Sequence, residues 1–533
     1  MLSTSILWSG LAKSSGVGRV TYKRIPIPHV ATDDVIPCDG LDDTRTVRTI
    51  IMGCEFRFNE VLDCDKIHAA LARLLEIGEW RKLGGRLRLN KASGRLEFHV
   101  PDQFTRGRPA VRYSHIRYHD IDMEQHPRMA AHFPHPTTTP SVQSGFDQYI
   151  DLLEPDQSLH KFEDYLCSDH PLLSLHTLSF RDATVLVLKW PHAMTDAMGR
   201  HALLRNWSYV LAGHIDKVQP LMGGLEHKGS DVTTEIAKLD PEPPSELEVA
   251  GHQRLTGIGM LLFIMRFIWV LLFGGKVVPK VLFVPAATIK VLKDEAQRDL
   301  GISEGLAKRK ELPPRLSEGD ILTAWLARLS LLSSSTRSVA IMTVVDMRRR
   351  LRCIFGQQPG PTGPVWVQNL TSVAMAHTTV QSLLTNPLGE TARHIRSAVQ
   401  EQTTPEFVAR CVRSFHSLPP SQRPGLYAKS DSILVAVSNW HCAKFFDVFD
   451  VSRAIVAGDH RPSSSGIQWP TESRPGKPVA VVPVGFSDNP ELRNSWGVMG
   501  KDAAGNYWMQ GMCTEATWKA IEKELGRLGR GER

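Results

Sequence analysis

The run His192-Ala-Met-Thr-Asp196 places an imidazole and a carboxylate four positions apart. A neutral imidazole with an ordinary pKa of about 6.5 can take a proton from a hydroxyl group near neutral pH. The same spacing also begins at His29 and at His227. Because a short pattern recurs by chance in a chain with 21 histidines, the spacing does not identify a catalytic group. The predicted helices and strands around each of the three histidines must therefore show which one is the candidate.

Only His192 stands between two predicted rigid elements. Residues 183–190 form a short apolar, β-branched run typical of a buried strand, and Pro191 is expected to end it. Residues 200–211 predict a helix with one apolar face. His29 lies in a proline-rich loop and His227 in a polar stretch. The context therefore favours His192 as the candidate general base.

Size and composition indicate an ordinary globular protein with several domains. The 533 residues exceed one usual core, and 42% hydrophobic and 22% charged residues are normal values. The 63 basic and 56 acidic residues give a net charge of +7 that is spread along the chain. No basic and aromatic nucleic-acid-binding module is recognised, so we expect no nucleic-acid partner.

The cysteine pattern predicts reduced thiols. Eight cysteines are present without any C-x-x-C pair, which argues against a disulfide framework and a zinc site. The adjacent His441 and Cys442 supply too few ligands, so no metal is expected. The first residues do not resemble a signal peptide. A cytoplasmic protein is the expectation.

An apolar segment, residues 257–275, leaves three interpretations open. A helix of this length would span roughly 28 Å, close to the thickness of a bilayer core. Arg266 stands at its centre, where a charge is costly in lipid. The segment is therefore a helix docked on the protein, an interfacial helix that associates with a membrane, or a true span.

The coarse pattern predicts two α/β halves of similar size. Residues 1–217 form the first half, residues 218–280 a polar linker followed by the apolar helix 257–275, and residues 281–533 the second half. Strand-like and helix-like runs alternate in both halves. The clearest predicted strands lie in 48–58, 95–100, 183–190, 280–286, 338–347, 364–376 and 432–440, and the clearest helices in 65–77, 200–211, 287–300 and 318–332.

The strand, the H-x-x-x-D pattern, Gly199 and the following helix together resemble the signature of CoA-dependent acyltransferases of the BAHD type. Further motifs of that family are matched in the expected order along the second half. They are the S-x-x-D-x-L-x-A helix at 317–324, the D-x-R strand at 346–348, the Ser-Asn-Trp segment at 438–440, and a C-terminal stretch, 500–525, similar to the fungal branch. At 450–454 the chain keeps only Asp450 of the family's D-F-G-W-G motif.

The resemblance implies a chloramphenicol acetyltransferase-like fold, with two mixed-sheet domains and a channel between them. It implies that His192 is the general base and that Asp196 faces away to pair with a basic group, for which Arg348 is the candidate. Asp450 is expected to hold a loop of the second domain beside the site. Gly199, Trp440 and Arg348 are expected to border the bound substrates. Guanidinium groups of the run 348–352 could also meet the phosphates of CoA or form a solvated face.

The same resemblance implies an O-acetyltransferase of fungal secondary metabolism. Acetyl-CoA would be a co-substrate rather than a resident cofactor, and the acceptor a hydrophobic hydroxylated terpenoid, polyketide or meroterpenoid. We expect a monomer, with membrane contact only through 257–275. A Ser-His-Asp hydrolase is not expected, since no G-x-S-x-G motif is present. The alternatives are a carrier-protein-dependent condensation enzyme, which usually has two adjacent histidines where this chain has Pro191-His192, and an inactive binding homologue.

Overall fold

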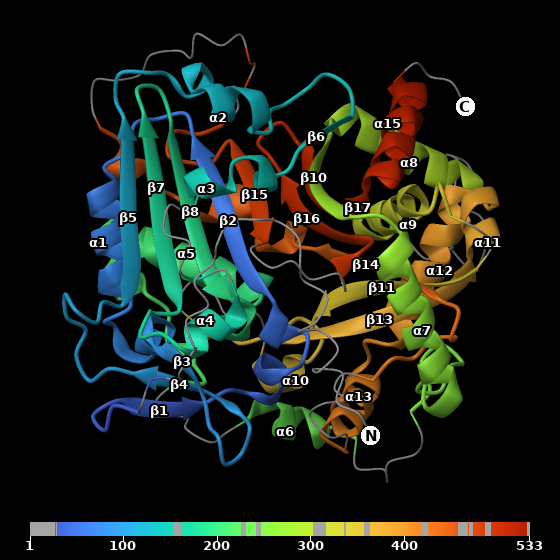
Figure 1. Cartoon of the computed structure of the whole chain (residues 1–533), viewed down its shortest axis with the longest axis horizontal. Helices are drawn as coiled ribbons and strands as arrows, with labels where there is room; N and C mark the ends of the chain where they lie inside the picture. Colours follow the sequence, from blue (N-terminus) through green and yellow to red (C-terminus); the bar gives the residue numbers. More distant parts are fainter. Residues whose placement is uncertain are drawn as a thin grey trace.

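The computed structural model confirms the α/β class and shows two large mixed sheets (Figure 1). Helices and strands alternate along the whole chain. The residues that the structure describes are 27, 29–153, 159, 161–224, 231–240, 247–301, 316–334, 337–356, 363–417, 425–456, 467, 469, 473–485 and 492–529.

The first sheet has five strands and consists mainly of the N-terminal half. β5 and β7 are parallel, and the other neighbours are antiparallel. β2, β7 and β8 are almost wholly buried, which explains their apolar runs, whereas in β5 only Val111 is buried. In spatial order they are β15 (Ala480–Gly485), β2 (Ile51–Phe58), β8 (Thr184–Pro191), β7 (Leu173–Phe180) and β5 (Val111–Tyr118).

The second sheet has seven strands and consists mainly of the C-terminal half. Its centre is parallel, since β14 runs in the direction of both β11 and β16, and its flanks are antiparallel. In spatial order the strands are β13 (Thr371–Thr379), β11 (Ser338–Asp346), β14 (Ile433–Asn439), β16 (Ser495–Lys501), β17 (Tyr507–Thr514), β10 (Val277–Val284) and β6 (Ser141–Ser144).

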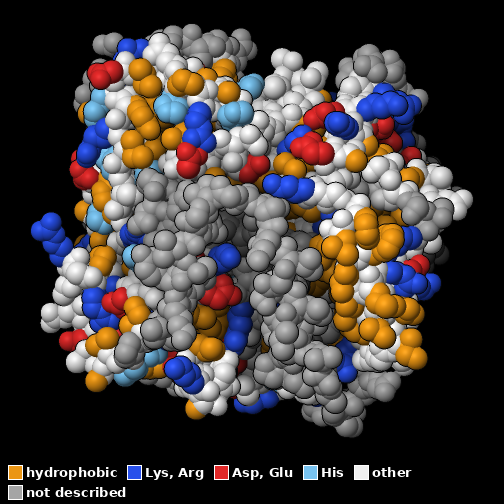
Figure 2. Space-filling model, in the orientation of Figure 1, with side chains coloured by type: hydrophobic (Ala, Val, Ile, Leu, Met, Phe, Trp, Pro, Cys, Tyr) orange, Lys and Arg blue, Asp and Glu red, His pale blue; other side chains and the backbone are white. Residues whose placement is uncertain are grey.

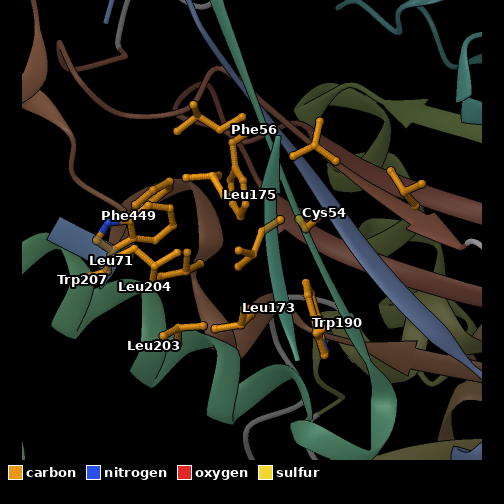
Figure 3. Packing of buried hydrophobic residues seen from close by; sticks show 14 of the residues in the cluster. Cys54, Phe56, Leu71, Leu173, Leu175, Trp190, Leu203, Leu204, Trp207 and Phe449 are labelled. Carbon is orange, nitrogen blue, oxygen red and sulfur yellow. The ribbon is translucent and has the colours of Figure 1, made fainter. Parts of the chain in front are cut away.

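Helices cover both sheets. α1 (Cys64–Leu74), capped by the Asp63 side chain, lies beside α5 (Ala197–Leu211) on the first sheet. Figure 3 shows Leu203, Leu204 and Trp207 of α5 facing Leu173 and Leu175 of β7 across a dry core. On the second sheet lie α8 (Ala286–Asp299), α9 (Glu318–Ser330), α12 (Leu388–Glu401) and α15 (Glu515–Gly529), and shorter helices include α13 (Pro405–Ser417) and α14 (Phe445–Val448).

Two small sheets complete the fold. β1 (Asp34–Pro37), β4 (Leu96–Val100) and β3 (Arg86–Leu89) form an antiparallel sheet, and the turn of the β3–β4 hairpin contains Gly94 at positive φ. β9 (Leu221–Met222) pairs with β12 (Val365–Trp366). The described parts of the predicted polar linker thus contain a strand and also a short helix, α6 (Val232–Ala237).

Each large sheet takes one edge strand from the other half of the chain. β6 belongs to the N-terminal half and pairs with β10, while β15 belongs to the C-terminal half and pairs with β2. Phe449 of the C-terminal half also packs into the core of the first sheet, where its ring lies 4.7 Å from that of Trp207 (Figure 3). The two sheets and the two halves of the sequence therefore do not coincide, and the predicted boundaries at 217 and 281 stay a prediction.

The apolar segment forms helix α7 (Gly257–Phe273) on the surface of the second half (Figure 1). None of its residues is buried. Within the described part of the chain, every helix is too short or too polar to cross a membrane.

Candidate active site

His192 lies at the end of β8, where the chain leaves the first sheet in a single 3₁₀ turn, His192–Met194, before α5 begins. Its backbone N–H donates to the Ile50 carbonyl at 3.0 Å, which continues the β2–β8 pairing by one residue. Its carbonyl accepts a hydrogen bond from Asn369 Nδ2 at 2.9 Å. The backbone of His192 is thus fixed from both halves of the chain.

The environment of His192 favours a neutral imidazole. Burial lowers the pKa of the ring because the charged form is the more strongly hydrated one. The Arg200 cation opposes protonation further. Nδ1 is buried and makes no hydrogen bond with the described residues. This arrangement suits a base that must be unprotonated before the reaction starts.

Asn369 of the second half also binds Asp42 of the first half. Its backbone N–H and its Nδ2 both donate to Asp42 Oδ1 at 2.7 Å. Burial raises the pKa of Asp42 well above its usual range. The two residues were not singled out from sequence, and no local pattern could indicate a contact between positions so far apart in the chain.

Asp196 caps α5 and binds the second half. Its Oδ1 accepts the backbone N–H groups of Met198 at 3.0 Å and Gly199 at 2.9 Å, as expected of an N-terminal aspartate. Its Oδ2 accepts the Leu370 N–H at 2.9 Å. Both oxygens also bind Arg348, at 3.0 and 3.1 Å. The carboxylate points away from the His192 side of the turn and has no free acceptor role toward a substrate.

Arg348 is the partner that the sequence suggested for Asp196. Its guanidinium also contacts Asp346 at 2.8 Å and the carbonyls of Trp366 and Gln368. Its side chain is 13% exposed and that of Asp196 only 4%. Every nitrogen of the guanidinium is therefore bound within the protein, and the group lies at the contact between the halves rather than beside an open substrate site.

Gly199 lies where α5 comes closest to the segment before β13. A Cβ atom there would lie 2.1 Å from Thr195 Oγ1 and 2.2 Å from the Val367 carbonyl oxygen. Thr195 Oγ1 itself donates to that carbonyl at 2.6 Å. The need for glycine therefore comes from the close approach of two backbone segments.

Arg200 is a functional candidate that the sequence reasoning missed. It is fully buried, and its guanidinium nitrogens make no hydrogen bond with described residues. Its guanidinium carbon lies 3.9 Å from the Phe445 ring, 4.8 Å from Trp440 and 5.3 Å from Trp190. Three aromatic faces thus replace acceptors around a cation near His192. The sequence offered one signal for this candidate, because Arg200 lies on the apolar face of the helix predicted over 200–211.

Trp440 follows β14 and belongs to this aromatic enclosure. Its indole N–H donates to Ser438 Oγ at 2.6 Å, and its backbone N–H donates to the Val498 carbonyl. A Cβ atom on Gly497 would lie 3.5 Å from its ring. Trp440 is therefore held from the second sheet while it contacts Arg200 of α5, so it lies at the same contact between the halves.

The structure does not bring Asp450 together with His192. The Asp450 N–H donates to Ser208 Oγ, and its carboxylate pairs with Lys477 at 3.0 Å. Ser208 lies roughly 16 Å along α5 from the His192 end, at 1.5 Å per residue. Asp450 borders a separate surface cavity of about 420 Å³ that Arg205 and Lys444 also line.

The arginines of the run 348–352 differ in exposure. Arg348 is bound within the protein as described above, whereas Arg349, Arg350 and Arg352 are exposed. Arg350 also donates to Thr403 Oγ1 at 2.5 Å. Among the described residues, no group of three or more His, Cys, Asp or Glu could hold a metal ion.

Comparison with known proteins gives consistent relatives. No family model matches the chain. It is 36% identical to acetyltransferase BOT5 of Botryotinia fuckeliana over 515 residues, which cover 92% of this chain and 90% of that protein. It is 31% identical to O-acetyltransferase PaAT-2 of Phomopsis amygdali over 507 residues, which cover 94% and 99%.

A solved structure shows the same fold. TRI101 of F. graminearum, crystallised with coenzyme A and T-2 mycotoxin, is similar with a TM-score of 0.62 over 92% of this chain and 98% of that one, at 15% identity. The fold of this solved structure agrees with the two mixed sheets. The chain belongs to the fungal acetyltransferases that include BOT5 and PaAT-2 and is an acyltransferase.

Proposed function

We propose that this enzyme transfers an acetyl group from acetyl-CoA to a hydroxyl group of a terpenoid, polyketide or meroterpenoid, with His192 as the general base. The observation that carries the proposal is the position of His192. It is a partly buried imidazole, favoured in its neutral form, whose backbone is held by Ile50 of the first half and Asn369 of the second.

The proposed reaction is a single displacement. Because Nδ1 is buried, we assign proton transfer to Nε2. His192 takes the hydroxyl proton as the acceptor oxygen attacks the thioester carbonyl carbon. The carbon–sulfur bond then breaks, and the imidazolium returns the proton to the CoA thiolate. The products are the ester and free CoA, and no acyl-enzyme forms.

The residues around His192 take positioning roles in this proposal. Asp196 and Arg348 fix the turn through bonds that leave neither group available to a substrate. Burial favours the neutral imidazole, and the Arg200 cation acts in the same direction while the Asp196 carboxylate acts against it. Gly199 allows the close approach of the two halves, and Trp440 encloses Arg200 from the second sheet. Asp450 has a structural role at the far end of α5.

The acceptor class rests on the relatives. TRI101 structures contain coenzyme A together with T-2 mycotoxin or with deoxynivalenol, both fungal natural products. A hydrophobic hydroxylated acceptor for this chain extends that pattern. The channel between the two domains would admit CoA from one face and the acceptor from the other. We also propose that the enzyme acts as a monomer in the cytoplasm, and the eight free cysteines fit that reducing compartment.

The test compares wild type, His192→Asn and His119→Asn, a matched change at an exposed histidine. Release of free CoA thiol from acetyl-CoA is followed with a panel of hydroxylated terpenoids and polyketides. We expect acceptor-dependent release that His192→Asn reduces by about 10²–10⁴, as for loss of a general base. His119→Asn should keep the wild-type rate.

Three outcomes would count against the proposal. Acceptor-dependent release that survives His192→Asn would remove His192 as the base. CoA binding, measured by calorimetry, without turnover on the whole panel would favour an inactive binding homologue. Turnover with an acyl carrier protein but not with acetyl-CoA would favour the condensation-type alternative.

A further inference from the structure

Helix α7 presents an unusual concentration of exposed apolar side chains. Of the twelve large apolar side chains that are exposed among the described residues, seven belong to this one helix. Ile258 is 78% exposed and Trp269 65%. Figure 2 shows the resulting hydrophobic patch over the place that α7 occupies in Figure 1. The seven residues are Ile258, Leu261, Met265, Ile268, Trp269, Leu272 and Phe273.

These residues form one continuous stripe. At 3.6 residues per turn they fall within an arc of roughly 140° around the helix axis. The helix is about 26 Å long at 1.5 Å per residue, so the stripe is long, narrow and rich in aromatic residues at its C-terminal end. A contiguous apolar surface of this kind marks an interaction site on a soluble domain.

Polar contacts hold α7 against the protein and leave the stripe outside. The Arg266 guanidinium donates to the carbonyl and the hydroxyl of Ser430, both at 3.0 Å. Arg493 donates to the carbonyls of Gly274 and Gly275 at 2.9 and 2.6 Å, which satisfies the C-terminal end of the helix. Arg266, whose charge would be costly inside a membrane, is thus directed to the protein.

The charges around the stripe fit an anionic surface. No aspartate or glutamate occurs between Val249 and Lys293. The nearby carboxylate of Asp431 faces the cation of Arg337. A second copy of the chain, packed stripe to stripe, would bring two basic borders together, whereas anionic lipid headgroups would attract them. The basic residues in this interval are Arg254, Arg266, Lys276, Lys280, Lys290 and Lys293. Lys280 pairs with Glu515 and Glu522, Lys293 pairs with Glu318, and Lys290 lies on α8. The basic border of the stripe therefore consists of Arg254 and Lys276, which stand beside the two ends of α7.

We propose that α7 binds the surface of an anionic phospholipid bilayer. The helix lies in the plane of the interface, with its apolar stripe among the upper acyl chains and its basic flanks at the headgroups. Trp269 and Phe273 lie at the headgroup level, where aromatic rings are favoured. This docking does not rest on the proposed reaction, because it needs neither acetyl-CoA nor an acceptor.

The test is co-sedimentation of the whole chain with vesicles. Vesicles of phosphatidylcholine alone are compared with vesicles that also contain phosphatidylserine, at low and at high salt. Variants are Leu261→Glu/Trp269→Glu in the stripe and Val291→Glu on α8, a matched control because Val291 is an exposed apolar residue, at 52%, outside the stripe. Thermal unfolding confirms that each variant is folded.

We expect wild type and Val291→Glu to bind the phosphatidylserine vesicles and high salt to weaken this binding. The double variant should bind at least tenfold more weakly with an unchanged melting temperature. Absence of wild-type binding to either vesicle would overturn the proposal. Light scattering that shows a wild-type dimer and a monomeric double variant would overturn it in favour of a second copy.

Discussion

Removing the Asp196 carboxylate tests whether this residue supports the turn or takes part in the chemistry. In Asp196→Ala the helix cap, the Leu370 contact and a buried ion pair are lost together. Arg348 keeps its ion pair with Asp346, so the cost is at most that of breaking a buried pair, about 3–5 kcal/mol, which is still a large part of the roughly 5–15 kcal/mol that usually separates folded from unfolded states. Asp196→Asn keeps one oxygen for the cap but loses the charge, so about half that cost is expected.

The measurement is the free energy of unfolding in urea, followed by tryptophan fluorescence, for both variants, for Arg348→Met and for Asp196→Asn/Arg348→Met. Because the two side chains contact each other, the double variant should lose less than the two single ones together, by about 0.5–3 kcal/mol. Asp450→Asn is the matched control. Its carboxylate is 42% exposed and has one ion pair, so a change below about 1 kcal/mol is expected.

The reasoning would be refuted if Asp196→Asn unfolded at the wild-type urea concentration and yet lost about 10² or more in kcat. That result would place Asp196 in the chemical step. Additive effects of Asp196→Asn and Arg348→Met would likewise remove their ion pair as the source of stability.

Three further predictions follow from the same geometry. The rate constant kcat/KM should rise with pH with its midpoint below the ordinary histidine value of about 6.5, because burial lowers the pKa of His192, and Arg200→Met should move this midpoint to higher pH; an unmoved profile would contradict the role of Arg200. Burial raises the pKa of Glu55 to about 8, so the folded state binds the proton more tightly and wild-type stability should fall as pH rises from about 5 to 8. Glu55→Gln should abolish this fall in urea midpoints taken at both pH values, and an identical slope in the two proteins would exclude Glu55 as its source. Gly199→Ala should cost about 1–3 kcal/mol, since its Cβ would lie 2.1 and 2.2 Å from two oxygen atoms, whereas Gly107→Ala, with open space around it, should unfold like wild type.

Local patterns in the sequence predicted much of this fold. The strand before His192, the helix after it and the hairpin with Gly94 are each determined by residues close together in the chain. The pairing of Asp196 with Arg348 was also anticipated, because both belong to family motifs. The order of the family motifs therefore predicted one long-range contact. The periodicity of the hydrophobic residues alone could not have predicted it.

Contacts between distant, unremarkable residues were not predictable in this way. Asn369, which holds the His192 carbonyl, stands in an ordinary stretch before a strand. Arg200 was hidden because charged residues on helices are usually solvated, and only the three aromatic rings from separate elements explain its burial. For residues 257–275, hydrophobicity left three interpretations open because it does not reveal which polar groups tie a helix to the protein.

The exchange of edge strands has a consequence for biosynthesis. β2 leaves the ribosome early, but its neighbour β15 is made near the end of the chain. At about 5–20 residues per second, one edge of the first sheet stays unpaired for roughly 20–85 s, with its backbone donors open to other nascent chains. Truncation before Ala480 would make that exposure permanent, so shortened transcripts should yield aggregates rather than a smaller folded unit.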